Sequence, residues 1–130
     1  MVYADTDFFV ALLKKRDWLK REAKRLLRRY AGKIWTSPAT LIELLLLSSE
    51  FNIDPRRLVV DALLIAELRG GDFHPILIAA HYVKESDVNV FDALHAAFCG
   101  TDPIISSDKV FDRLGLERIP LEPADGRRAA

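Results

Sequence analysis

The sequence predicts an α/β fold, a three-layer α/β/α sandwich built around a central parallel sheet of four to five strands. Short apolar runs, typical of strands buried on both faces, alternate along the chain with longer segments of helical periodicity. Strands that alternate with helices are joined by crossovers and therefore run parallel. With 130 residues, half of them hydrophobic, the chain is expected to form a single domain over residues 1–123, with residues 124–130 as a flexible tail.

Four apolar segments and one weaker candidate account for the expected strands. The first segment and the one at Ile104-Ile105 both run into small polar residues and then an acid. Pro120 confines the last strand to an edge of the sheet, because proline lacks the N–H that a central strand needs. The expected strands cover residues 2–4, 33–37, 103–107 and 118–121, and the weaker candidate covers residues 73–75.

The helices are delimited by capping residues and prolines. Ser37-Pro38 and Asp54-Pro55 each provide an N-cap followed by a first-turn proline, and Asp17 is placed to cap an earlier helix. The helix after Pro38 is apolar on every side around Glu43, so we expect it to be buried on most of its surface. The expected helices cover residues 8–15, 18–31, 38–50, 54–68, 76–85, 90–99 and 109–114.

Composition excludes several classes of protein. The 19 basic and 19 acidic side chains cancel, so net charge alone predicts no partner. The single cysteine, Cys99, excludes an internal disulfide and a cysteine metal cluster, and it is expected to be a small buried helix residue. Asp5 and Asp7 interrupt any signal peptide, and the longest apolar run, Leu44–Leu47, is too short to span a bilayer. We therefore expect a soluble, cytoplasmic protein.

Four acids stand in unusual positions. Asp5 and Asp108 follow expected strands, whereas Glu43 and Asp92 lie within apolar helices. Since the carboxyl ends of parallel strands form the usual site in such folds, we expect these acids to gather there. Their mutual repulsion would require a divalent cation, and Mg²⁺ or Mn²⁺ prefers oxygen ligands. Metal-assisted phosphodiester hydrolysis needs no nucleophilic side chain, so the pattern indicates a metal-dependent nuclease.

The same residues, with their neighbours, resemble the PIN-domain family and, within it, the VapC-like ribonuclease toxins. The motifs that carry the resemblance are, in chain order, Ala4-Asp5-Thr6-Asp7, Thr40-Leu41-Ile42-Glu43-Leu44, Phe91-Asp92-Ala93-Leu94-His95-Ala96-Ala97, Ile105-Ser106-Ser107-Asp108-Lys109-Val110-Phe111 and Ile119-Pro120-Leu121. The resemblance covers nearly the whole chain and implies a parallel sheet between layers of helices.

The resemblance also implies an activity and assigns roles to residues. It implies a Mg²⁺- or Mn²⁺-dependent endoribonuclease, the toxin of a type II toxin–antitoxin pair, which forms a homodimer and is silenced by a cognate antitoxin. The metal ligands would be Asp5, Asp92 and Asp108, and Glu43 would join them in catalysis. Thr6 and Ser107 match supporting polar positions, and Asp112 matches a peripheral one.

Positive charge is concentrated in one segment of this neutral chain. Between Lys14 and Lys33 there are ten basic residues and only two acidic ones. Such a face suits ordinary solvated surface, a polyanion or an acidic partner. The candidates for contact with RNA or with an antitoxin are Arg16, Arg21, Lys24, Arg25 and Arg28.

Two other functions remain open from the sequence. The opening Asp5-Thr6-Asp7 also suits a haloacid-dehalogenase-like phosphatase with Asp5 as nucleophile, although that class calls for Thr or Val where this chain has Phe9. A catalytically silent PIN-like module that only binds a partner is the second alternative.

Two residues near the four acids have open roles. Asp7 stands where an asparagine is frequent in the family, and it either adds negative charge to the site or caps the following helix. His95 follows Asp92 by three residues on the same helix face, and it is expected to be packed or hydrogen-bonded rather than a metal ligand.

Overall fold

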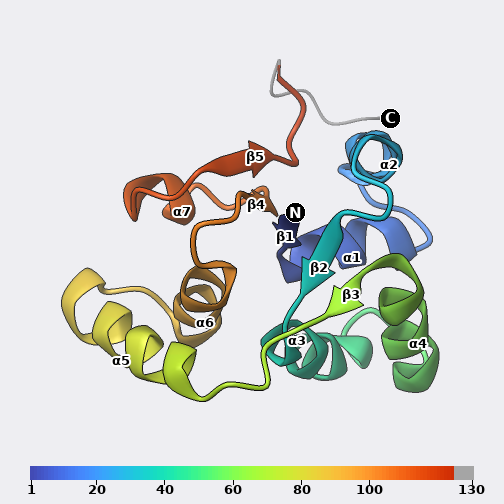
Figure 1. The fold of residues 1–130 in the computed structure, drawn as a ribbon. Coiled ribbons are helices and arrows are strands. Elements are labelled where there is room, and N and C mark those ends of the chain that lie inside the picture. The colour runs from blue at the N-terminus through green and yellow to red at the C-terminus, as the bar shows by residue number, and fades with distance from the viewer. Residues whose placement is uncertain (125–130) are drawn as a thin grey trace.

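The structure is a computed structural model that describes residues 1–124. A five-stranded parallel sheet in the order β3-β2-β1-β4-β5 forms its centre (Figure 1). Val2 and Tyr3 pair with Ile34 and Trp35 on one side of the first strand, and Ile104 and Ile105 pair with it on the other. The strands are β1 (Val2–Ala4), β2 (Ile34–Thr36), β3 (Glu67–Leu68), β4 (Ile104–Ser106) and β5 (Arg118–Pro120).

Helices cover both faces of the sheet, so the predicted three-layer α/β/α fold is confirmed. Helices α1, α2 and α4 lie on one side of the sheet, and α5, α6 and α7 lie on the other (Figure 1). The helices are α1 (Thr6–Leu13), α2 (Lys20–Arg29), α3 (Pro38–Ser48), α4 (Pro55–Ile65), α5 (His74–Ser86), α6 (Val90–Cys99) and α7 (Val110–Arg113). None of the helices in the described part of the chain is long and apolar enough to cross a membrane.

Alternation along β1 divides the core between the two faces. Val2 and Ala4 are packed with residues of α1, α2, α3 and α4. Tyr3, which points to the opposite face, is packed with residues of α6 and α7. All three side chains are buried, which explains why the strand contains no polar residue that faces solvent.

The strands follow the sequence prediction except at one edge of the sheet. The weaker candidate at residues 73–75 is wrong, because α5 begins at His74, and the fifth strand is β3 instead. β3 falls inside the helix expected over residues 54–68, which ends at Ile65. Glu67 and Leu68 are exposed and carry no strand pattern; they are extended because they pair with Trp35 and Thr36 of β2. Pro120 lies on an edge strand, as predicted.

α3 is exposed along one face, and its other residues are buried or partly buried. Ile42, Leu45 and Leu46 are all at least half exposed. Ser37 occupies the predicted N-cap position of α3, but its hydroxyl makes no capping hydrogen bond. That hydroxyl lies 2.7 Å from the Tyr3 hydroxyl instead. The predicted cap at Asp54 is confirmed, since its side chain accepts from the N–H of Arg56.

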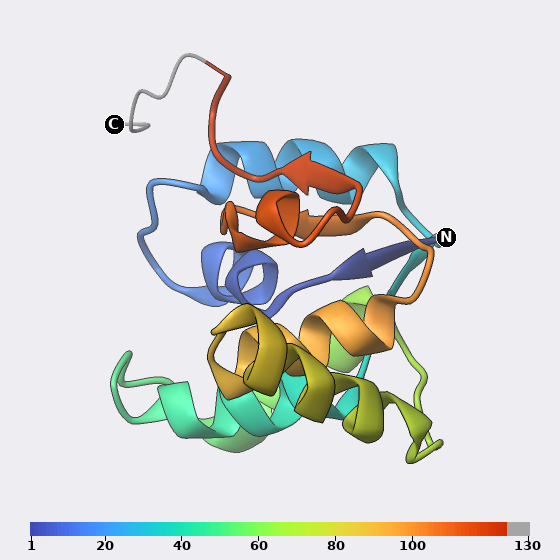
Figure 2. The ribbon, with the colours of Figure 1, turned by 90° about the vertical axis from the view of Figure 1, so that its left-hand side faces the viewer.

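The parallel arrangement brings the carboxyl ends of all five strands to one edge of the sheet. β1 and α1 are separated only by Asp5, so α1 starts directly at that edge (Figure 2). α3 begins two residues after β2. Residues 125–130, most of the predicted flexible tail, lie outside the described residues.

Candidate active site

Asp5 occupies the junction between β1 and α1. It is the N-cap of α1, with one carboxylate oxygen accepting from the N–H of Thr6 at 2.7 Å. The other oxygen accepts from the hydroxyl of Ser106, at the end of β4, at 2.7 Å. Only 6% of Asp5 is exposed. Burial, assisted by the charge of Glu43, raises the pKa of this carboxyl above its ordinary 3.8, although His95, Ser106 and Thr6 oppose the rise.

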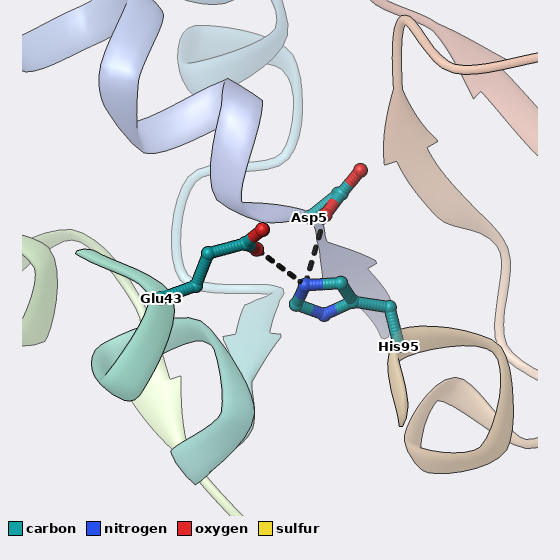
Figure 3. Close-up of side chains that lie close together, drawn as sticks. All are labelled: Asp5, Glu43 and His95. Atoms are coloured by element: carbon teal, nitrogen blue, oxygen red, sulfur yellow. Dashed lines mark hydrogen bonds and ion pairs between the residues drawn. The ribbon is translucent and has the colours of Figure 1, made fainter. Parts of the chain in front are cut away.

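His95, from α6, contacts Asp5 and Glu43 at once (Figure 3). Its Nε2 atom lies 2.9 Å from Glu43 Oε1 and 3.2 Å from Asp5 Oδ1. The ring is 1% exposed, so the expectation of a packed, hydrogen-bonded histidine is confirmed. Burial lowers the pKa of His95, but the surrounding acids and the hydrogen bonds outweigh this, and the pKa is raised well above 6.5.

Glu43 points from α3 toward this histidine and is only partly buried. Burial alone would raise the pKa of Glu43, but hydrogen bonds from His95 and Thr6 and the charge of His95 lower it below 4.5. Asp5 and Glu43 therefore shift in opposite directions although they share one histidine, because Asp5 is the more deeply buried of the two. With its pKa below 4.5, Glu43 is ionised at neutral pH.

Asp92 and Asp108 belong to the same electrostatic neighbourhood. Burial raises the pKa of Asp92 to about 6, and the charges of Asp108, Asp5 and Glu43 contribute to the rise. Asp92 lies in the first turn of α6, where its carboxylate accepts from the side-chain amide of Asn89 at 2.8 Å. Asp108 is exposed; its N–H donates to the Ser106 hydroxyl, and its carboxylate accepts from the N–H of Val110. The charges of Asp108, Asp5 and Glu43 therefore all act on Asp92.

Asp7 does not cap α1, so that interpretation is wrong. One of its carboxylate oxygens accepts from both the N–H and the hydroxyl of Ser107, the residue after β4. Its other oxygen, Oδ1, is buried and has no hydrogen-bond partner among the described residues. Burial and then the charge of Asp5 raise the pKa of Asp7 to about 8. Asp7 therefore adds a fifth acidic group to this edge of the sheet.

The predicted supporting residues have different surroundings. The hydroxyl of Thr6 lies 3.2 Å from Nε2 of His95, and Ser107 donates to Asp7. Asp112 is exposed and forms a bidentate ion pair with Arg118 of β5, at 3.0 and 3.1 Å. Thr6 and Ser107 thus contact the acid cluster directly, and Asp112 is engaged outside it.

The basic residues form an exposed surface on and before α2. Four of them, Arg21, Lys24, Arg25 and Arg28, lie on α2, and Arg16 lies in the connection before it. Arg25 forms an ion pair with Glu22 on the same helix. The face that was predicted to be positive is therefore open to a partner.

Three polar residues of the site have contacts that the sequence did not indicate. Ser106 bridges Asp5 and the backbone of Asp108. Tyr3 donates to or accepts from Nδ1 of His95 at 2.8 Å, and Ser37 lies behind Tyr3. The signal available in the sequence was the alternation along β1, because it places the hydroxyl-bearing Tyr3 on the opposite face of the sheet from Val2 and Ala4.

The donor set fits a divalent cation. Asp5 and Glu43 each offer one carboxylate oxygen, and these oxygens and a ring nitrogen of His95 all lie within 4.8 Å of one another. Asp5, Asp7 and Asp92 all have raised pKa values because they are buried near other negative charges. A bound cation offsets that cost, and carboxylate oxygens are the ligands that Mg²⁺ and Mn²⁺ prefer.

Sequence comparison assigns the chain to a family. Residues 2–116 match the PIN domain family. The chain therefore belongs to the PIN domain family.

Three solved structures with the same fold come from toxin–antitoxin complexes. VapBC2 from Rickettsia felis, bound to a DNA fragment from its promoter, is similar with a TM-score of 0.73 and 16% identity, over 92% of this chain and 98% of the other. VapBC-1 from nontypeable Haemophilus influenzae is similar with a TM-score of 0.67 and 17% identity, over 93% of this chain and 98% of the other. A toxin–antitoxin complex from Klebsiella pneumoniae is similar with a TM-score of 0.65 and 18% identity, over 84% of this chain and 88% of the other. At these identities the likeness establishes the fold. No curated protein sequence matches the chain significantly.

Proposed function

We propose that this protein is a metal-dependent endoribonuclease and the toxin of a type II toxin–antitoxin pair. The observation that carries the proposal is the set of acids at the carboxyl edge of the sheet. Asp5 and Glu43 both contact His95, and the charge of Asp108 contributes to the raised pKa of Asp92. Membership of the PIN domain family and the toxin–antitoxin complexes among the structural neighbours support it.

The acids have different roles in the proposed reaction. Asp5, Asp92 and Asp108 would hold Mg²⁺ or Mn²⁺, which when bound neutralises the carboxylates and stabilises negative charge on the phosphate. Glu43 is ionised at neutral pH and its side chain is 24% exposed, so it can accept a hydrogen bond from the attacking water. Thr6 and Ser107 hold the residues around these acids, whereas Asp112 acts at a distance through Arg118.

An acidic site repels RNA, and the basic surface offsets that repulsion. Arg16, Arg21, Lys24, Arg25 and Arg28 are the proposed contacts to phosphates, because Lys and Arg supply most of the binding free energy for nucleic acids. An acidic segment of the antitoxin would compete for the same side chains. Competition between RNA and antitoxin would couple substrate binding to inhibition.

Exposed apolar side chains support protein partners. They occur on three helices, with Leu46 of α3, Leu64 of α4 and Leu77 of α5 each more than 60% exposed. Exposed apolar side chains that form a contiguous surface mark protein interfaces in soluble proteins. We propose that they serve the homodimer and the cognate antitoxin, and analytical ultracentrifugation of the purified chain tests the first of these.

The nuclease proposal is tested with purified, antitoxin-free protein and a mixture of labelled RNAs. We expect cleavage with Mg²⁺ or Mn²⁺ and none with EDTA. Asp5→Asn removes a buried metal ligand, so cleavage should fall on the order of 100-fold or more, as when other groups that act in the transition state are removed. Circular dichroism should show an intact fold.

The control is Asp72→Asn, which makes the same chemical change at an exposed residue and should cleave like the wild type. A wild-type protein that cuts no RNA with either metal would contradict the proposal, as would an Asp5→Asn variant with full activity. Metal binding without cleavage would favour the catalytically silent binding module.

A further inference from the structure

His95 lies at the centre of a buried polar chain that joins three elements. Nε2 faces Glu43 of α3 and Asp5 at the end of β1, and Nδ1 lies 2.8 Å from the hydroxyl of Tyr3 in β1. The Tyr3 hydroxyl lies 2.7 Å from Ser37 Oγ, at the start of α3. This series of polar contacts thus runs from the start of α3, through β1 and α6, and back to Glu43 on α3.

The orientation of the ring is fixed from behind. Tyr3 is fully buried, and its ring packs edge-on against Trp35 with centroids 4.9 Å apart. Its hydroxyl therefore has one fixed position, and a hydrogen bond to Nδ1 sets the rotation of the imidazole. With 1% exposure, the imidazole has no water available to replace these contacts.

This geometry makes Nε2 a donor. The ionised carboxylate of Glu43 only accepts hydrogen bonds, so Nε2, which lies 2.9 Å from Glu43 Oε1, must carry the proton. In the neutral ring, the Tyr3 hydroxyl donates to Nδ1 and leaves the proton on Nε2. In the cationic ring both nitrogens donate, and the Tyr3 hydroxyl can donate to Ser37. Either way Nε2–H faces two carboxylates.

We propose that His95 is a positioning residue, which holds Asp5 and Glu43 in the orientation that binds the cation and water, and that Tyr3 orients His95. The proposal rests on the proposed nuclease function. Outer hydrogen-bond partners of metal-binding carboxylates are typically worth 10- to 100-fold in metal affinity or activity. Without Nε2–H, Glu43 loses its only hydrogen bond from α6 among the described contacts.

The test uses Mn²⁺ affinity, measured by electron paramagnetic resonance on the full-length protein, beside RNA cleavage. His95→Asn places no donor near the carboxylates and should weaken Mn²⁺ binding 10- to 100-fold. His95→Gln can place its amide N–H near the position of Nε2 and should recover part of the loss. Tyr3→Phe keeps the packing against Trp35, and we expect a loss of about 3- to 10-fold, since it removes one hydrogen bond.

The matched control is His81→Gln, at an exposed histidine of α5, which should leave affinity and cleavage unchanged. For the variants at His95 we expect kcat to fall while KM for RNA stays within about twofold, because a positioning residue acts on the reacting groups and not on distant phosphates. Thermal unfolding of each variant reports the fold, and Tyr3→Phe keeps the proposal testable if both His95 variants fail to fold.

Two outcomes overturn the inference without touching the nuclease proposal. Strong electron spin-echo modulation from a directly bound nitrogen in the Mn²⁺-loaded wild type would make His95 a ligand. Wild-type affinity and kcat in both His95→Asn and Tyr3→Phe would leave it with no positioning role. Conversely, Mn²⁺ binding that depends on His95 in a protein that cuts no RNA would support the positioning role and contradict the nuclease. Absence of Mn²⁺ binding would overturn both.

Discussion

At the scale of single residues, Asp7 differs from Asp5 in the hydrogen bonds that its carboxylate oxygens accept. Both oxygens of Asp5 accept hydrogen bonds, whereas Oδ1 of Asp7 is buried without a partner among the described residues. An ionised carboxylate is costly in such surroundings, and the pKa of Asp7 is accordingly raised to about 8. Asp7 therefore holds its proton in the folded, metal-free protein at neutral pH.

This raised pKa predicts a stability that falls as the pH rises. Between about pH 4 and pH 8 the unfolded chain has lost the proton of Asp7 while the folded chain retains it. Because the folded state then binds more protons, its free energy of unfolding decreases over that interval and levels off above pH 8. Asp7→Asn removes the titration, so the variant should gain stability relative to wild type by up to about 1.4 kcal/mol for each pH unit of this interval and little near pH 4.

Urea unfolding in EDTA from pH 4 to pH 8 measures this difference. Asparagine can still accept from Ser107, and its amide replaces the protonated oxygen, so the two neutral forms are comparable. Glu85→Gln, at an exposed acid of α5, is the control and should follow the wild-type curve. Wild-type and Asp7→Asn curves that stay parallel over the interval would rule out the shift.

The same variant separates the nuclease from the phosphatase interpretation. A phosphatase that uses Asp5 as nucleophile needs Asp7 as its general acid, so Asp7→Asn would abolish turnover of a phosphate ester. In the nuclease, Asp7 holds the residue beside Asp108, and asparagine can keep that contact. RNA cleavage should therefore survive Asp7→Asn and be lost in Asp5→Asn.

At the scale of elements, the ends of β4 and β5 are held by Arg118. Its side chain is 7% exposed and donates to Asp112, to Glu122 and to the carbonyl of Ser106. Ser106 is the residue that donates to Asp5, so the arginine supports the site from the neighbouring strand. The planar guanidinium can satisfy all three partners at once, which a lysine ammonium cannot do in the same geometry.

Arg118→Lys should therefore destabilise the protein by about 1–2 kcal/mol, the amount expected when one or two charged hydrogen bonds are removed. Denaturant unfolding at constant pH and salt measures the change. Arg113→Lys is the matched control, because Arg113 makes one exposed hydrogen bond, to Ser86, and its effect should stay within about 0.5 kcal/mol. Equal destabilisation in the two variants would show that the Arg118 network contributes nothing beyond an exposed contact.

Elements with a strong local pattern were predictable from the sequence. The apolar strands β1, β2 and β4 and the edge position of Pro120 follow from residue type alone. β3 was not predictable, because its two exposed residues are extended only through pairing with β2. The exposed face of α3 carries no signal of its own in the sequence, since apolar side chains on a helix look the same whether the fold or a partner covers them.

Within the candidate site, the sequence singled out the four acids but did not indicate their contacts. Asp5, Glu43, Asp92 and Asp108 were marked by acids set against apolar surroundings. The contact of His95 with Glu43 joins residues 52 positions apart, and no local pattern encodes it. Ser106 and Ser107 are neighbours in the sequence, but their side chains point in opposite directions, so Ser106 donates to Asp5 and Ser107 donates to Asp7.

At the scale of the whole molecule, equal numbers of acidic and basic residues conceal a separation of charge. Acids gather at the carboxyl edge of the sheet, and exposed bases gather on α2, which lies on the same side of the sheet as α1 (Figure 1). A polyanion is attracted by the second surface and repelled by the first. RNA binding by this neutral protein should consequently depend on salt through α2.

Replacing Arg21 and Arg28 with glutamine tests that dependence. If each arginine neutralises one phosphate of single-stranded RNA, the slope of log affinity against log salt should become shallower by about 0.7 for each arginine replaced. KM should rise at physiological salt while kcat is retained, because the acids that react are unchanged. The control is Arg56→Gln on α4, an exposed arginine outside the basic surface. An unchanged salt slope in the double variant would contradict RNA binding by α2 and would favour antitoxin binding by this helix instead. The affinity for the antitoxin, measured with the same variants, should then decrease.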